Sequence, residues 1–70
     1  MNGAITIVVN GDQRELQADT TLLDLLSGLD LDPRAVVVEL NRTIVRRPEL
    51  GDTTLTDGDR VELVHFVGGG

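Results

Sequence analysis

The stretch at residues 4–17, AITIVVNGDQRELQ, determines how the fold begins. The β-branched residues expected on one face of its first arm are Ile5, Ile7 and Val9. Asn10-Gly11 favours a type I′ turn, which needs positive φ at both central residues. The second arm is mostly polar, with Leu16 as its clearest inward residue, which is typical of an edge strand with one solvated face. This stretch therefore predicts a β-hairpin.

Residues 19–33, DTTLLDLLSGLDLDP, change to a helical period. The apolar residues that form a stripe at this spacing are Leu22, Leu25, Leu26 and Leu29. Thr21 is the expected N-cap, and Asp24 three residues later resembles a short capping box. Pro33 is expected to end the helix, because the residue before a proline avoids the helical region.

Residues 35–45, AVVVELNRTIV, return to strand composition, with a tight turn expected at positions 41–43. The alternation puts Val36, Val38 and Leu40 on one side and Val37 and Glu39 on the other. The next segment, at residues 49–59, is rich in turn residues, and Leu55 is its single expected core residue. RVELVHFV at residues 60–67 then predicts a last strand. This order predicts an α+β fold, a mixed sheet of about five strands packed on one helix.

Composition excludes several functional classes. The chain has 70 residues, which suits one domain, and a net charge of −6 from six arginines, no lysine and twelve acidic residues. Nucleic acid is an unsuitable partner for such a surface, whereas a basic patch on another protein is a suitable one. The absence of cysteine excludes disulfides, thiolate metal sites and a cysteine nucleophile. We expect no signal peptide and no membrane span, and therefore a cytoplasmic protein.

Catalytic and metal-binding patterns are weak in this sequence. His65 is the only histidine, so it has no second histidine with which to share a metal. The acidic residues of TDGD at positions 56–59 are expected to serve a turn, because the rest of a calcium loop is missing. The Arg46-Arg47 pair is expected to be solvated. We predict no metal site and no active site.

The last strand indicates a docking surface. Alternation places Val61 and Leu63 on one side, and Val64 and Phe66 on the other. If the first pair belongs to the core, Val64 and Phe66 lie on an uncovered face and form a candidate partner-docking patch. The alternative is that a shifted register brings Phe66 into the core.

The final residues, Gly68, Gly69 and Gly70, allow two interpretations. They are either a frayed terminus or a segment that an enzyme threads. Glycine fits a cleft that is too narrow for any side chain, and the α-carboxylate of Gly70 would be an anion at neutral pH. Such a carboxylate could attack a phosphorus atom.

Five segments in this order resemble the ThiS family of sulfur carriers in thiamine biosynthesis. They are VNGD in the hairpin, the leucine helix after TT, ELNRTIV, LTDGDRVELV and the final Gly-Gly. The resemblance spans nearly the whole chain and implies a β-grasp, ubiquitin-like domain at residues 1–67 followed by a flexible glycine tail at residues 68–70.

The resemblance also implies a reaction cycle and its partners. A ThiF-like adenylating enzyme would use ATP and Mg²⁺ to convert the carboxylate of Gly70 to an acyl-adenylate, with Gly68 and Gly69 threaded into that enzyme. A sulfur donor such as a cysteine-desulfurase persulfide would then leave a thiocarboxylate, and a ThiG-like thiazole synthase would take the sulfur. The chain itself would be a substrate that binds no cofactor and is not an enzyme.

Two alternatives stay open at this point. One is the small subunit of molybdopterin synthase, a similar carrier that delivers sulfur to a pterin precursor. The other is a β-grasp interaction module with an inert tail.

Overall fold

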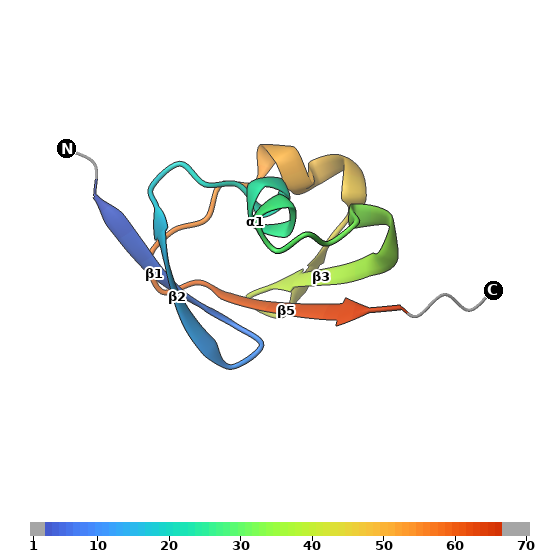
Figure 1. Cartoon of the computed structure of the whole chain (residues 1–70), viewed down its shortest axis with the longest axis horizontal. Coiled ribbons are helices and arrows are strands. Elements are labelled where there is room, and N and C mark those ends of the chain that lie inside the picture. The colour runs from blue at the N-terminus through green and yellow to red at the C-terminus, as the bar shows by residue number, and fades with distance from the viewer. Residues whose placement is uncertain (1–2, 67–70) are drawn as a thin grey trace.

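The structure of the chain is a computed structural model, and it describes residues 3–66. Within these residues it contains five strands, one α-helix and two short 3₁₀ helices, η1 and η2 (Figure 1). In chain order the elements are β1 (Ala4–Val9), β2 (Asp12–Gln17), α1 (Leu22–Gly28), η1 (Pro33–Ala35), β3 (Val36–Leu40), β4 (Thr43–Val45), η2 (Arg47–Asp52) and β5 (Arg60–His65). The predicted order of strands and helix is confirmed.

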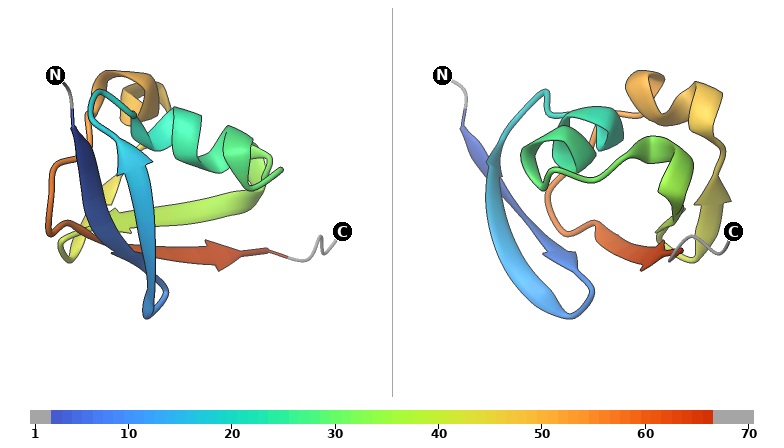
Figure 2. Two further views of the ribbon diagram at one scale, coloured as in Figure 1. Left: turned by 60° about the vertical axis from the view of Figure 1, so that its left-hand side comes forward. Right: turned by 45° about the vertical axis from the view of Figure 1, so that its right-hand side comes forward.

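The strands form one mixed sheet in the order β2-β1-β5-β3-β4. The pairing of β1 with β5 is parallel, and the other three pairings are antiparallel. A parallel neighbour needs a crossover connection, and α1 lies within that connection. α1 and η2 cover the same face of the sheet (Figure 2), so the opposite face carries no helix among the described residues.

Both hairpins turn through two residues with positive φ. Asn10 and Gly11 have φ of 49° and 87°, and Asn41 and Arg42 have φ of 51° and 73°. Positive φ at both central residues is the property of a type I′ turn, whose twist matches that of the flanking strands. The first turn is as predicted, whereas the second is one residue shorter than expected because Thr43 already belongs to β4.

Helix α1 begins with the predicted capping box. The Thr21 hydroxyl accepts a hydrogen bond from the Asp24 N–H at 3.1 Å, and the Asp24 carboxylate accepts one from the Thr21 N–H at 3.1 Å. This exchange satisfies two backbone donors that the first turn of a helix leaves free.

The prediction that Pro33 ends the helix is wrong, because α1 already ends at Gly28. Asp30 adopts the left-handed conformation, with φ of 60°. Its N–H donates to the Ser27 carbonyl, and the Leu31 N–H donates to the Leu26 carbonyl at 3.0 Å. These two bonds form a Schellman motif, which terminates a helix by satisfying its last carbonyls. The proline instead opens η1.

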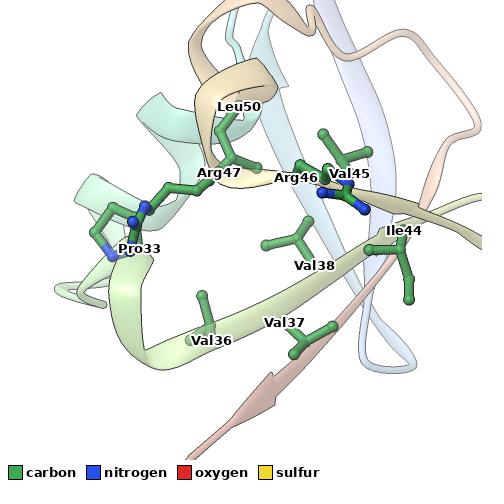
Figure 3. A pocket seen from close by; sticks show the side chains of 9 residues that line it. All are labelled: Pro33, Val36, Val37, Val38, Ile44, Val45, Arg46, Arg47 and Leu50. Atoms are coloured by element: carbon green, nitrogen blue, oxygen red, sulfur yellow. The ribbon is translucent and has the colours of Figure 1, made fainter.

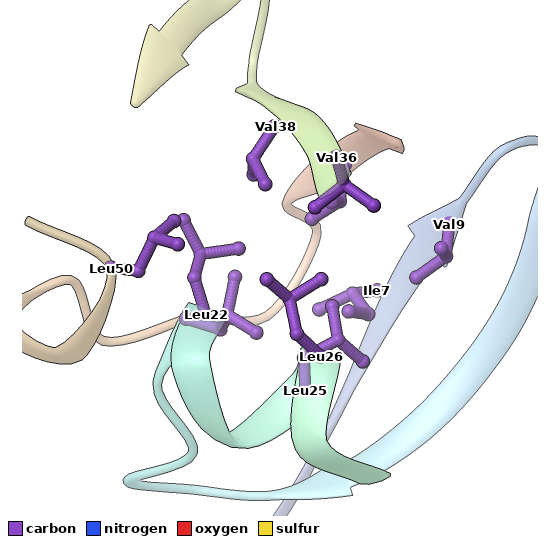
Figure 4. Packing of buried hydrophobic residues seen from close by; sticks show 10 residues of the cluster. Ile7, Val9, Leu22, Leu25, Leu26, Val36, Val38 and Leu50 are labelled. Carbon is purple, nitrogen blue, oxygen red and sulfur yellow. The ribbon is translucent and has the colours of Figure 1, made fainter. Parts of the chain in front are cut away.

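The core lies between α1, η2 and the covered face of the sheet (Figure 4). Its ten buried side chains are Ile7, Val9, Leu22, Leu25, Leu26, Val36, Val38, Leu50, Leu55 and Val61. The prediction that Leu55 is the single core residue of its segment is wrong, because Leu50 is equally buried. Leu50 enters the core because residues 47–52 form η2, a helix that a turn-rich composition did not indicate.

Candidate functional site

The outer side of β5 carries the two residues predicted to dock a partner. Val61 is fully buried and Leu63 is partly buried, whereas Val64 is 57% exposed and Phe66 is 51% exposed. The Phe66 N–H donates to the Ala35 carbonyl at 2.8 Å, so the alternation of the strand extends to this residue. The predicted alternation is confirmed, and the alternative that Phe66 completes the core is not observed.

Two residues that the sequence reasoning did not select extend this surface. Val37 of β3 lies directly opposite Val64, and Ile44 of β4, 60% exposed, lies opposite Glu39 on the same face. Figure 3 shows Val37 and Ile44 on the side of β3 and β4 opposite to Val38. We call Val37, Ile44, Val64 and Phe66 the outer patch. Alternation along the sequence had already placed Val37 on the outer side of its strand. The position of Ile44 could be known only from the pairing register of β3 and β4.

Two carboxylates border the outer patch. Glu39 and Glu62 lie directly opposite each other on β3 and β5, next to the pair of Val37 and Val64. The one ion pair among residues 3–66 joins Arg34 to Asp32, so neither glutamate has a basic partner within this part of the chain. Like charges placed opposite each other in a sheet repel, so the arrangement costs folding stability. An apolar patch with an acidic border suits a partner that presents apolar and basic groups.

The Arg46-Arg47 pair lies at a small cleft beside β3 and β4, whose lining also includes Val37 and Ile44 of the outer patch. The cleft has a volume of about 170 Å³, and its walls include Val36, Val38 and Leu50 (Figure 3). Neither arginine forms an ion pair within residues 3–66. Both arginines are exposed beside the edge strand β4, so the prediction of a solvated pair is confirmed.

The carboxylates of the acidic turn before β5 close the turn and tie it to β1. Asp57 accepts a hydrogen bond from the Thr6 N–H at 2.7 Å, and Asp59 accepts one from the Thr56 N–H at 2.8 Å. These carboxylates therefore stabilise the turn, as predicted. His65 is exposed at the end of β5. Residues 3–66 contain no group of three or more histidine, cysteine or acidic side chains that could hold a metal ion.

The predicted tail, Gly68, Gly69 and Gly70, lies outside the described residues, as does the boundary predicted at residue 67. The structure does describe the strand that leads to the tail. β5 ends at one extremity of the molecule (Figure 1). Val64, near the end of β5, and Phe66, just after it, both belong to the outer patch. No helix of residues 3–66 has both the length and the apolar character needed to cross a membrane.

Comparison with solved structures defines the fold class as ubiquitin-like β-grasp. The ubiquitin of Caldiarchaeum subterraneum superposes with a TM-score of 0.57 at 20% identity over the whole of both chains, which shows the fold alone. The crystal structure of the thiamine biosynthesis protein ThiS from Geobacter metallireducens superposes with a TM-score of 0.78 at 36% identity. This superposition covers 94% of the present chain and 100% of the Geobacter chain. The predicted fold class is confirmed.

Sequence comparison identifies the family within this class. The model of the ThiS family matches residues 7–70. The sulfur carrier protein ThiS of Bacillus subtilis is 40% identical over 63 residues, which are 89% of this chain and 96% of that protein. The chain therefore belongs to the ThiS family.

A second kind of relative is much longer. A thiazole synthase of Magnetococcus marinus is 44% identical over 64 residues, which are 91% of this chain but 20% of the synthase. A thiazole synthase of Paramagnetospirillum magneticum is 41% identical over the same length and with the same coverage. The chain thus spans about one fifth of the length of these relatives.

Proposed function

We propose that this chain is a sulfur carrier for the thiazole of thiamine, with the α-carboxylate of Gly70 as the group that carries the sulfur. The observation that supports this most strongly is the family match, which extends through Gly70 and includes the sulfur carrier of Bacillus subtilis over nearly its full length. The chain would act as a substrate of other enzymes.

The proposed chemistry follows from what a carboxylate can and cannot do. A carboxylate is a poor electrophile, so a ThiF-like enzyme holding ATP and Mg²⁺ would first adenylate it and release pyrophosphate. The terminal sulfur of a persulfide would then attack the carbonyl carbon, and AMP would leave. Attack of a second thiol on the resulting acyl disulfide would form a new disulfide and release the thiocarboxylate. Because this chain has no cysteine, partner proteins or small thiols would supply both the persulfide and the second thiol.

The outer patch is the proposed docking surface for the activating enzyme. Glycine has a large conformational entropy to lose, so holding the tail in a narrow cleft requires contacts elsewhere on the carrier. Phe66 lies four residues from Gly70, and with Val64 it offers two half-exposed apolar side chains beside the tail. The acidic border would steer the carrier toward a basic surface.

A ThiG-like thiazole synthase is the proposed acceptor of the sulfur. In two bacteria a segment similar to this chain forms about one fifth of a protein named thiazole synthase. Joining two partners in one chain raises their effective concentration for each other, so such fusions are typical of proteins that work together.

Partner choice and removal of Gly70 test this function against its alternatives. We expect the purified chain to bind a thiazole synthase and not the large subunit of a molybdopterin synthase. We also expect removal of Gly70 to abolish ATP–pyrophosphate exchange with the activating enzyme while the unfolding transition stays unchanged. Capture by the molybdopterin synthase subunit would support the pterin carrier. Unchanged partner binding and function without Gly70 would support an inert module.

A further inference from the structure

The strand that leads to the tail loses one of its two neighbouring strands after its second residue. β1 pairs with β5 only at Val8 opposite Arg60 and Val9 opposite Val61. β5 continues to His65, but β1 stops because the chain turns back at Asn10 into β2. The β1–β2 hairpin then departs from β5 (Figure 2), and a hollow of about 360 Å³ opens between them.

The side chain of Asn10 takes the place of the missing strand residue. The Asn10 main-chain N–H donates to the Val61 carbonyl at 2.9 Å, which is the last main-chain bond from this side. Its side-chain amide then binds Leu63 twice. The Leu63 N–H donates to Asn10 Oδ1 at 2.7 Å, and Asn10 Nδ2 donates to the Leu63 carbonyl at 3.2 Å.

These two bonds reproduce what a neighbouring strand would supply to Leu63. An amide side chain carries one donor and one acceptor group, as a peptide unit does. The left-handed conformation of Asn10 belongs to the hairpin turn, so the turn that ends β1 also aims this amide at β5. On its other edge Leu63 lies opposite Val38 of β3. It is the last residue of β5 with a neighbour on both edges, and Val64 of the outer patch follows it directly.

We propose that Asn10 is a positioning residue for the carrier reaction. Its amide fixes the direction in which β5 presents Val64, Phe66 and the chain beyond them to the activating enzyme. The inference rests on the proposed function, because it assigns a role in the delivery of Gly70. Without the amide, the end of β5 is held by β3 on one edge alone.

The second hairpin supplies a matched control. Asn41 also has positive φ at the first position of a two-residue turn. Its side chain accepts a hydrogen bond from the Arg60 N–H at 2.9 Å and donates one to the Asp59 carboxylate at 3.0 Å. It therefore holds the beginning of β5, at the end remote from the tail. Glycine tolerates positive φ, so Asn10→Gly and Asn41→Gly each remove an amide and keep the turn.

The experiment measures adenylation of both variants and the wild-type chain by a ThiF-like enzyme over a range of carrier concentrations. We expect both variants to unfold at similar urea concentrations. We expect Asn10→Gly alone to lower kcat/KM by about tenfold, because a displaced end of β5 impairs both docking and the placement of the reacting group. Residual dipolar couplings of the N–H groups of residues 63–66 provide a second readout, and they should change in Asn10→Gly and not in Asn41→Gly.

The possible results distinguish the positioning role of Asn10 from the carrier function of the chain. Equal kcat/KM for the two variants, or unchanged dipolar couplings in Asn10→Gly, would overturn the positioning role while leaving the carrier function intact. Absence of adenylation in the wild-type chain would overturn the proposed function and this inference together.

Discussion

Val37 of β3 and Val64 of β5 lie directly opposite each other on the sheet face that α1 does not cover. A small domain gains most of its stability by burying apolar surface, so an apolar pair on the uncovered face offers little to folding. Ile44 and Phe66 extend the same face, each with more than half of its surface accessible. Apolar side chains gathered in this way are typical of a surface that a partner covers, which is the role we propose for the outer patch.

Substitution of the outer patch should separate docking from folding. We expect Phe66→Ala to weaken binding of the activating enzyme by about tenfold or more, which is typical of an aromatic residue at the centre of an interface. The free energy of unfolding should fall by only about 1 kcal/mol or less, because half of the side chain is already in water. Calorimetric titration and urea unfolding measure the two quantities.

Leu23→Ala is the control for this prediction. Leu23 is 42% exposed on α1, on the covered side of the sheet and away from the outer patch. The Leu23→Ala substitution should leave the affinity for the activating enzyme unchanged. A loss of several kcal/mol of stability in Phe66→Ala with unchanged affinity would show that Phe66 serves the fold instead.

The pair of Glu39 and Glu62 should affect stability and association in opposite directions. Glu62→Gln removes a repulsion between opposite residues, so we expect stability to rise by about 0.2–1 kcal/mol. The same change should slow association with the activating enzyme at low salt, because it weakens steering toward a basic surface. Stopped-flow measurements at low and high salt test this, with Glu15→Gln on the edge strand β2 as control. Salt-independent association of the wild-type chain would contradict the steering.

Leu50 should matter for stability as much as the leucines of α1. Leu50→Ala leaves a cavity in the core, and we expect it to cost about 2–5 kcal/mol of unfolding free energy. Thermal and urea unfolding measure the loss, again with Leu23→Ala for comparison. A loss as small as that of the exposed leucine would show that η2 is not packed on the core as described.

The turn before η1 should respond to acid through Asp32. Hydrogen bonds from the side chain and the main-chain N–H of Arg34 lower the pKa of Asp32 to about 2. A carboxyl whose pKa is lowered in the folded state adds stability above its unfolded pKa, and that stability is lost as the pH falls toward 2. Carbon-detected NMR titration of Asp32 measures the value. Arg34→Gln should raise this pKa, and an unchanged pKa in that variant would contradict the assigned cause.

Local chemistry explains which features the sequence predicted. The turn at Asn10-Gly11 and the capping box of Thr21 and Asp24 depend on residues at most three apart, and both were foreseen. The apolar faces of the strands followed from alternation alone.

Features that depend on distant contacts were missed or misjudged. Leu50 is buried because η2 packs on α1, which no local pattern revealed. The bonds between Asn10 and Leu63 join residues 53 positions apart, and Ile44 joins the outer patch only through the register of β4. The end of α1 is instead a local feature that was misplaced, because the left-handed conformation of Asp30 terminates the helix before the proline is reached.

The central claim, that Gly70 carries sulfur on its carboxylate, is tested most directly by mass spectrometry of the intact chain. The sample is the wild-type chain after incubation with ATP, Mg²⁺, the activating enzyme and a persulfide donor. We predict a mass increase equal to the exchange of one oxygen for sulfur, which fragmentation assigns to Gly70 and which is absent when ATP is omitted. An unchanged mass with an active enzyme and donor, or an exchange located on any other residue, would contradict the account.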